Sequence, residues 1–517
     1  QQSATLDHRT IQSDGMYLAL RHAFGVEGCI RDNVAFVTMP DPDADGAGLV
    51  LGYLIHPVGQ QVALHGVDDG SMKFLVQRQK NVREVLALCV SPNKRVIAVC
   101  ERGRAPDEDP GNAQVSVYLV GSCKRIRTML FPGRGDFVSC CFSGDSKWLV
   151  TSGSDLDSNV VVWNWDKEKA SCVSKTAQNH GFNATRVAFD PGDHNFLTTS
   201  GPNHLRLWYA SSDNVLKAHA IVPQAREQET FADHTWIGGT AGQPTRMVAI
   251  TDGEFSVGTT EHHGQRIASV LVFDSIDGSP YLELKQTLQA PLPLTSRLET
   301  LMPFSKGFIV AGGGINGYLG VYENMDDARD PYMLIKSFSA KGAVLAGIAL
   351  NHHSEILYAY SKTNEILTFN LGSMDVLDDQ GNHFHSLLQG GNHIAPVVAI
   401  DACLTKPIVV TVGEDRMLRV WSYLRWKCEV VHEFRNEDPS CASLHPTGFQ
   451  VAVGFKDRIR IYSVLMEDLR LLRDIPLKNC RAVCYAHAGH LLAVASGFSV
   501  VVYSSITAQQ VESTTAT

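Results

Sequence analysis

A unit of alternating apolar strands and short turns recurs along the chain, and this repeat limits the possible folds more than any other feature. Each copy has an apolar strand, a turn such as Ser-Pro or His-Pro, a strand of the form L-x-V-x-S/G, a Gly/Asp turn and a strand ending in Trp or Tyr. We count ten copies, which begin at Leu54, Leu86, Val138, Thr185, Thr245, Leu301, Val344, His393, Ser440 and Arg481. One small antiparallel sheet cannot bury both of its faces, whereas sheets stacked around an axis cover one another. The repeat therefore predicts an all-β propeller.

The clearest copy, from His393 to Tyr423, identifies the type of repeat. His393, Thr411, Asp415 and Trp421 stand where WD repeats form a network of side-chain hydrogen bonds. We interpret this network as structural, so neither His393 nor Asp415 is predicted to be catalytic. The fold class that follows is a pair of tandem WD-repeat β-propellers, the first seven-bladed and the second present only in part.

The number of copies also predicts how the chain divides. Seven blades form a common closed ring, and the seventh copy ends near Leu371. We predict a flexible leader at 1–15, a first seven-bladed propeller at 16–372, a connection at 373–391, the first three blades of a second propeller at 392–505 and a polar tail at 506–517. Three blades do not close a ring and would expose a wide apolar edge. We expect either further blades of the native chain or a partner protein to cover that edge.

Composition and charge argue against several classes of partner. The net charge is −9 and no stripe of Lys or Arg is visible, so nucleic acid is not a predicted partner. No window approaches the ~18 consecutive apolar residues of a membrane span. Many of the 12 cysteines lie in apolar runs, which is typical of buried thiols in a reducing compartment. The nearest pair by motif, Cys480 and Cys484, has no second pair at zinc spacing, so we predict neither a metal nor another cofactor.

Motifs typical of enzymes are better explained by the repeat. Residues Gly312–Gly317 satisfy G-x-G-x-x-G, but a dinucleotide fingerprint must open a helix, and the strand-like run Tyr318–Tyr322 follows. We predict a hairpin turn there. No Walker sequence and no G-x-S-x-G elbow is present, so we predict no catalytic residues and no enzyme. The acidic insertions Pro40–Gly48 and Arg102–Asn112 are candidate binding loops, although a solvated loop is the simpler explanation.

Several stretches resemble one family, the WD-repeat region of the cilia- and flagella-associated protein 57 family. The order and register of the resemblance hold from about Leu20 to Ser505, and its most specific part is the ninth repeat, where V-G-F-x-D-x-[IL]-R begins at Val453. The stretches that carry the resemblance are Leu86–Glu101, Phe231–Gly239, Ser305–Asp327, Thr405–Tyr423 and Leu444–Gly497.

The resemblance implies a function that the residues alone do not. It implies two tandem seven-bladed propellers followed by a coiled coil, through which the family could oligomerise; this chain shows no sustained heptad run. It implies a scaffold or adaptor on the doublet microtubules of motile cilia and flagella, with axonemal proteins and inner dynein arm components as partners. The family offers no catalytic residues to transfer, and the protein-binding residues stay unknown. A general WD-repeat adaptor of another cytosolic complex, for instance in trafficking or ubiquitin transfer, and a propeller hydrolase are the alternatives.

Overall fold

Strands make up all the regular structure of the described residues, and they form ten four-stranded sheets in which neighbouring strands run antiparallel. We number these sheets 1 to 10 in chain order. The fold class is confirmed: the chain is all-β and built from WD-type blades. The computed structural model describes residues 20–26, 33–40, 50–75, 82–103, 113–130, 135–154, 160–174, 184–210, 216–221, 229–238, 245–252, 268–275, 282–290, 292, 297–314, 316–325, 327, 329–374, 383–387 and 391–515.

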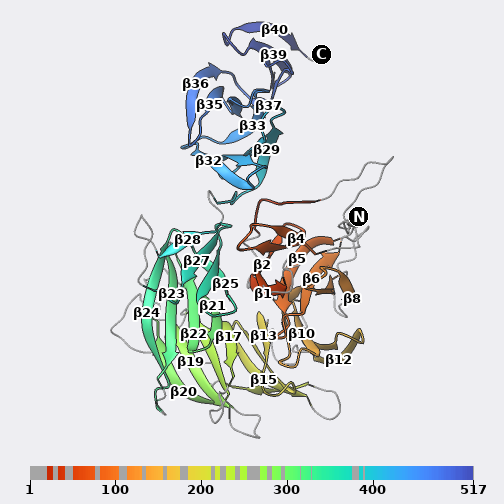
Figure 1. Cartoon of the computed structure of the whole chain (residues 1–517), viewed down its shortest axis with the longest axis vertical. Coiled ribbons are helices and arrows are strands. Elements are labelled where there is room, and N and C mark those ends of the chain that lie inside the picture. The colour runs from red at the N-terminus through yellow and green to blue at the C-terminus, as the bar shows by residue number, and fades with distance from the viewer. Residues whose placement is uncertain are drawn as a thin grey trace. The chain divides into compact units, whose positions relative to one another are not determined.

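The chain divides into two compact units: unit 1 comprises residues 1–362 and 366–385, and unit 2 comprises residues 363–365 and 386–517. Unit 1 contains sheets 1 to 7 (Figure 1). Their strands are, sheet by sheet, β1 (Ala35–Pro40), β2 (Val50–Val58), β3 (Gln61–Gly66), β4 (Met72–Phe74); β5 (Val82–Val90), β6 (Val96–Gly103), β7 (Ala113–Leu119), β8 (Arg125–Leu130); β9 (Phe137–Phe142), β10 (Trp148–Gly153), β11 (Val160–Asn164), β12 (Lys169–Ser174); β13 (Arg186–Phe189), β14 (Phe196–Gly201), β15 (His204–Ala210), β16 (Leu216–Ala220); β17 (Phe231–Ile237), β18 (Arg246–Thr251), β19 (Ser269–Ser275), β20 (Leu282–Gln289); β21 (Arg297–Phe304), β22 (Gly307–Gly313), β23 (Asn316–Asn324), β24 (Tyr332–Lys341); β25 (Leu345–Leu350), β26 (Ile356–Ser361), β27 (Ile366–Asn370) and β28 (Phe384–Ser386).

The hydrophobic core of unit 1 lies between consecutive sheets. One cluster joins sheets 1 and 2, the next joins sheets 2 and 3, and the series continues to sheets 6 and 7. The ring closes where β1 packs against β25 and where the rings of Phe36 and Tyr358 stack with their centroids 5.7 Å apart. Because every sheet of the ring is continuous in sequence, side-chain packing between sheets 7 and 1 makes the closure.

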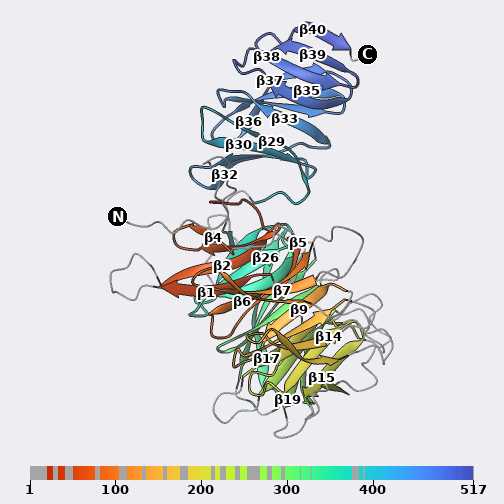
Figure 2. The ribbon, with the colours of Figure 1, turned by 90° about the vertical axis from the view of Figure 1, so that its right-hand side faces the viewer.

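Unit 2 contains sheets 8 to 10, which stack on one another in chain order (Figure 2). One core cluster joins sheets 8 and 9, and a second joins sheets 9 and 10. Sheets 8 and 10 therefore each have one face that no other sheet of this unit covers. The strands are β29 (Val397–Ala402), β30 (Ile408–Gly413), β31 (Met417–Ser422), β32 (Lys427–Glu433); β33 (Pro439–Leu444), β34 (Gln450–Phe455), β35 (Arg458–Val464), β36 (Leu469–Pro476); β37 (Cys480–Tyr485), β38 (Leu491–Ser496), β39 (Ser499–Ser504) and β40 (Gln510–Thr515).

Two strands lie in segments for which the sequence predicts no strand. β28 lies in the predicted connection at 373–391, and β40 lies in the predicted polar tail at 506–517. Both are fourth strands at the edge of a sheet. An edge strand can be held by backbone hydrogen bonds to its one neighbour, so its sequence needs only a weak alternation of apolar residues. The predicted leader at 1–15 and most of the insertions Pro40–Gly48 and Arg102–Asn112 lie outside the described residues.

The glycine-rich motif forms the predicted hairpin, because Gly313 pairs with Gly317 where β22 and β23 meet. Gly313 has a φ of 133°, which disfavours any other residue there. At Gly312, a Cβ would lie 2.2 Å from the carbonyl oxygen of Arg297. The glycines therefore serve the turn and the close approach of two strands.

Candidate protein-interaction surface

The side-chain network predicted from the clearest repeat is present in sheet 8. His393 precedes β29, Thr411 lies in β30, and Asp415 lies in the turn before β31. The His393 Nδ1 atom is 3.0 Å from the Asp415 carboxylate, and its Nε2 atom is 2.8 Å from the Thr411 hydroxyl. The indole Nε1–H of Trp421 donates to the same hydroxyl at 2.7 Å. This chain of hydrogen bonds ties the start of the sheet to its second and third strands.

The Asp–His–Thr order resembles a hydrolytic triad, but its surroundings favour a structural role. The side chains of His393 and Asp415 are both buried, and the Thr411 hydroxyl is held by Trp421 as well as by His393. Burial raises the pKa of Asp415, but hydrogen bonds from His393 and two backbone amides outweigh burial and lower that pKa below its ordinary value. The carboxylate thus stays ionised as a fixed acceptor, while the buried hydroxyl is not presented to a substrate.

Related networks hold other sheets together. In sheet 4, the Thr199 hydroxyl lies 2.5 Å from His204 Nε2 and accepts from Trp208 Nε1 at 2.8 Å. In sheet 3, Trp163 Nε1 donates to Thr151 at 2.9 Å. Because the same contact recurs in three sheets, it belongs to the repeat and marks no single reactive centre.

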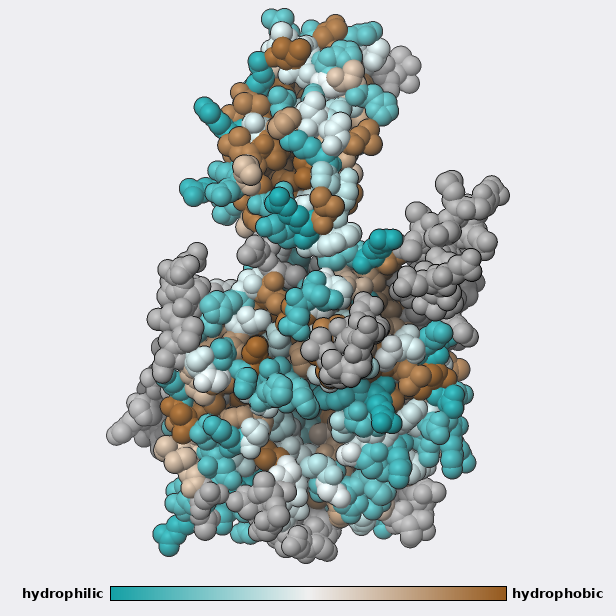
Figure 3. Space-filling view, viewed as in Figure 1, coloured by the Kyte–Doolittle hydropathy of each residue, from teal (hydrophilic) through white to brown (hydrophobic). Residues whose placement is uncertain are grey.

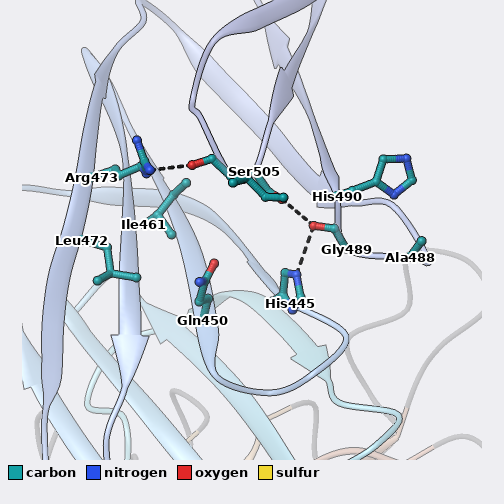
Figure 4. A pocket seen from close by; sticks show the side chains of 10 residues that line it. His445, Gln450, Ile461, Leu472, Arg473, Ala488, Gly489, His490 and Ser505 are labelled. Atoms are coloured by element: carbon teal, nitrogen blue, oxygen red, sulfur yellow. Dashed lines mark hydrogen bonds between the residues drawn. The ribbon is translucent and has the colours of Figure 1, made fainter.

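A pocket of about 440 Å³ lies between sheets 9 and 10 (Figure 4). Its polar groups bind the backbone of the pocket itself: Ser505 Oγ and His445 Nε2 approach the Gly489 carbonyl oxygen at 2.6 and 3.0 Å. Arg473 donates to the carbonyl oxygens of Ile506 and Thr507. These contacts fasten a turn of sheet 10 to β36 of sheet 9, and they supply no nucleophile paired with a base.

Among the described residues, no group of three or more His, Cys, Asp or Glu side chains is arranged to hold a metal ion. Cys480 is buried, and Cys484, four residues later, is exposed. Within the same part of the chain, no helix is long and apolar enough to cross a membrane. Arg458 and Arg460 of β35 both form ion pairs with Glu437 and Asp474, so carboxylates offset the charge of these two guanidinium groups.

The uncovered face of sheet 8 is the first candidate surface. Ladder partners share a face, and Ile400, Thr411, Arg419 and Val431 are partners in turn across β29 to β32. Ile400 is 70% exposed and Val431 is also exposed, whereas Thr411 and Arg419 between them are buried in the hydrogen-bond network. The opposite face of this sheet packs on sheet 9 through side chains such as Val410, Val412, Leu418 and Val420.

The uncovered face of sheet 10 is the second candidate surface. The corresponding face of sheet 9 is buried against a neighbouring sheet, which allows a comparison. Ala452, Ile459 and Ile461 of sheet 9 lie against sheet 10, with Ile459 fully buried. The ladders of the two sheets match, so Val500 of sheet 10 corresponds to Ile459, yet Val500 is 45% exposed. The face is formed by Ala482, Cys484, Ala493, Ala495, Val500 and Val502.

Most exposed large apolar side chains of the described residues lie in unit 2, although it is the smaller unit. Figure 3 shows such apolar side chains on the visible surface of this unit. An apolar surface of this kind typically marks an interaction site. The three-blade count predicts an exposed edge, but the sequence does not identify its members, because alternation shows which side chains share a face and not whether a neighbour covers it.

Comparisons with known proteins agree with the repeat and with the predicted resemblance. The family described as "WD domain, G-beta repeat" matches residues 123–164. This segment contains the turn before β8, strand β8 itself and the first three strands of sheet 3, β9 to β11. The chain is 24% identical to cilia- and flagella-associated protein 57 of Mus musculus over 95% of this chain and 40% of that protein. It is 23% identical to cilia- and flagella-associated protein 57 C of Tetrahymena thermophila over 93% of this chain and 40% of that protein.

A third relative has a different name. The chain is 20% identical to the 77 kDa echinoderm microtubule-associated protein of Lytechinus variegatus, over 87% of this chain and 61% of that protein. The chain thus spans about 40% of the length of the first two relatives. The chain contains a segment that matches the WD repeat, and over most of its own length it is similar to the cilia- and flagella-associated proteins 57, as the resemblance in its sequence predicts.

Proposed function

We propose that this protein is a non-enzymatic scaffold of the axoneme in motile cilia and flagella. The observation that carries the proposal is the similarity of nearly the whole chain to proteins whose names place them with cilia and flagella. Shorter matches to cilia- and flagella-associated proteins 44 and 52 point the same way. The buried, structural use of the Asp–His–Thr chain supports a role as an adaptor and not as an enzyme.

The finer proposal is that the scaffold helps to assemble or anchor inner dynein arms on doublet microtubules. Inner dynein arm components and proteins associated with doublet microtubules are the proposed partners. The name of the echinoderm relative, a microtubule-associated protein, supports a position near microtubules. A rigid ring of seven sheets offers a large surface for such contacts, because its core lies between the sheets and leaves the turns free for binding.

We also propose the division predicted from the repeat, with unit 2 as part of a second propeller. Val500 and its neighbours on sheet 10 have the composition of the face of sheet 9 that is buried against sheet 10. The free faces of sheets 8 and 10 are therefore suited to pack against further blades or against a partner protein. Oligomerisation through a coiled coil, which the resemblance implies, would come from residues other than those of this chain.

Localisation tests the scaffold proposal. A tagged copy expressed in a flagellated cell should lie along the axoneme and stay with it after detergent removes the membrane. Removal of the native protein should then deplete inner dynein heavy chains from isolated axonemes, as measured by quantitative mass spectrometry. A diffuse signal, with recovery of a ligase or coat complex on affinity purification, would instead favour the adaptor of another cytosolic complex. Axonemal localisation with a normal set of dyneins would contradict the dynein arm proposal alone.

Substitutions on the free faces test their part in assembly. Ile400→Glu and Val500→Glu place a charge on the uncovered faces of sheets 8 and 10, where both side chains are exposed. We expect both to reduce retention on the axoneme several-fold without loss of folding, as judged by circular dichroism. Leu130→Glu is the control, since Leu130 is as exposed as Ile400 but lies at the end of β8 in unit 1. Equal retention of all three variants would show that these faces do not contribute.

A further inference from the structure

Two cysteine side chains meet between sheets 9 and 10, and the network that stabilises the repeat does not use them. Cys441 lies on β33 and Cys480 begins β37, the first strands of neighbouring sheets, which pack against each other. Their sulfur atoms are 3.6 Å apart. Both side chains belong to the core between these sheets, with residue exposures of 7% and 4%. The neighbouring Ser440 is exposed, so the pair lies close below the surface.

A glycine provides the space in which the two sulfur atoms meet. Gly454 of β34 is the ladder partner of Cys441. A Cβ at Gly454 would lie 2.4 Å from the Cys441 sulfur and 2.6 Å from the Cys480 sulfur, which is too close for either contact. The repeat itself does not require glycine here, because the matching ladder positions of sheets 8 and 10 hold Val412 and Ala495. The glycine is therefore matched to the thiol pair.

The pair also has the electrostatics of one attacking and one resolving thiol. A hydrogen bond from Cys480, with smaller contributions from Ser440 and the Gly454 backbone, outweighs burial and lowers the pKa of Cys441 to about 7. The same hydrogen bond, together with burial, raises the pKa of Cys480. A substantial fraction of Cys441 is thus thiolate at neutral pH, and the thiolate is the reactive form towards an oxidant.

We propose that Cys441 and Cys480 form a reversible disulfide when the protein meets a peroxide, a modification that goes beyond the proposed scaffold function. The Cys441 thiolate attacks one oxygen of hydrogen peroxide, the O–O bond breaks, and sulfenic acid forms with release of water after protonation. The Cys480 sulfur then attacks the Cys441 sulfur, its proton leaves, and the sulfenic oxygen departs as a second water. Two thiols are oxidised and one peroxide is reduced to two waters; a dithiol reductant reverses the reaction.

The disulfide would close a loop of the chain from Cys441 to Cys480. This loop contains sheet 9, which runs from Pro439 to Pro476, apart from its first two residues. The bond would therefore join the first strands of two consecutive sheets in a unit whose outer sheets each have a free face. Oxidation is expected to strengthen sheets 9 and 10 against separation, because a cross-link removes conformational freedom from the unfolded chain. Transient disulfides of this kind are the type found in reducing compartments.

Peptide mapping tests the proposal on the purified chain. The protein is treated with hydrogen peroxide, its remaining thiols are alkylated, and it is digested with trypsin without reduction. We expect the peptide 436–456 joined to the peptide 479–481, two hydrogens lighter than the sum of the free peptides, and its loss after treatment with dithiothreitol. Complete alkylation of both cysteines, further oxidation of Cys441 without a bridge, or a bridge to Cys484 in place of Cys480 would each overturn the proposal.

Variants distinguish the pair from general thiol oxidation. Cys484→Ser, which removes the exposed thiol four residues away, should leave the bridged peptide unchanged. Gly454→Ala should reduce its yield several-fold, because the added methyl group displaces both sulfur atoms. In the wild-type protein, peroxide should raise the melting temperature of unit 2 by about 5 °C, and Cys480→Ser should abolish that rise. A rise of equal size in Cys480→Ser would assign the effect to another thiol.

Discussion

Three buried histidines make the stability of unit 1 depend on pH. Burial lowers the pKa of His56, His204 and His234 to about 3, with further lowering by His65, Arg206 and Arg186 respectively. In the unfolded chain these side chains titrate near 6.5. The unfolded state thus binds more protons between pH 6.5 and pH 3, so stability is full above pH 6.5 and falls as the pH drops through this window. The slope that each histidine contributes approaches about 1.4 kcal/mol per pH unit once its unfolded form is fully protonated, below about pH 5.5.

Urea denaturation at pH 7, 6 and 5 measures this slope. We expect His56→Gln to reduce it by about 1 kcal/mol per pH unit over this range, because a neutral amide replaces one titrating group and the unfolded imidazole is only partly protonated at pH 7 and 6. His445→Gln is a control in unit 2, where that histidine lines the pocket. An unchanged slope in His56→Gln would show that His56 titrates in the folded protein as it does in the unfolded chain.

The Thr411 hydroxyl is the second feature at the scale of single residues. It receives the Trp421 indole N–H at 2.7 Å and lies 2.8 Å from His393 Nε2. Thr411→Val keeps the shape of the side chain but removes this partner from two buried polar groups, so we expect a loss of about 1–3 kcal/mol in the free energy of unfolding of unit 2. Thr405→Val, at an exposed threonine of the same sheet, should cost less than 1 kcal/mol. Equal losses in urea denaturation would mean that the network adds little to stability.

At the scale of elements, the close approach of β21 and β22 predicts a strict need for glycine. A Cβ at Gly312 would lie within 3 Å of three backbone atoms of β21, which side-chain rotation cannot relieve. We expect Gly312→Ala to destabilise unit 1 by about 1–3 kcal/mol. Gly238→Ala is the matched control, since no atom lies within 4 Å of a Cβ built there. The measurement is the urea midpoint of each variant, and a wild-type midpoint for Gly312→Ala would contradict the tight packing.

The elements also show why the sequence predicts some of the fold and not the rest. Alternating apolar residues and turn glycines predict the ten copies, the hairpin at Gly312–Gly317 and the network around Thr411, because each depends on residues close in sequence or on a fixed motif. The edge strands β28 and β40 escape prediction because they pair through the backbone and bury few apolar side chains. The candidate surface cannot be predicted from the sequence for a related reason. Val500 and Ile459 occupy equivalent positions in similar strands, and only the arrangement of the sheets makes Val500 exposed and Ile459 buried.

At the scale of the whole molecule, the free faces of unit 2 should bind an apolar dye. The environment-sensitive dye ANS binds exposed apolar surface, and Ile400 and Val500 lie on two such faces. Replacing both by Thr keeps β-branching while adding polarity, so we expect weaker ANS fluorescence with a change in melting temperature of less than about 2 °C. The exposed Leu130 of unit 1 gives the control Leu130→Thr. If that variant lowers the fluorescence as much, the dye is reporting exposed residues in general.

The division into two units predicts two unfolding transitions, because each unit has its own core clusters and most contacts lie within a unit. In the closed ring, every sheet packs against a neighbouring sheet on both of its faces. In unit 2, sheets 8 and 10 each have one face that no other sheet of the unit covers, so unit 2 should melt at the lower temperature. Differential scanning calorimetry should then assign the transitions through variants already described. Thr411→Val should lower only the first transition and Gly312→Ala only the second, each by several degrees. One cooperative transition that moves with either substitution would show that the units unfold together, and the free faces would then contribute less to instability than the open geometry implies.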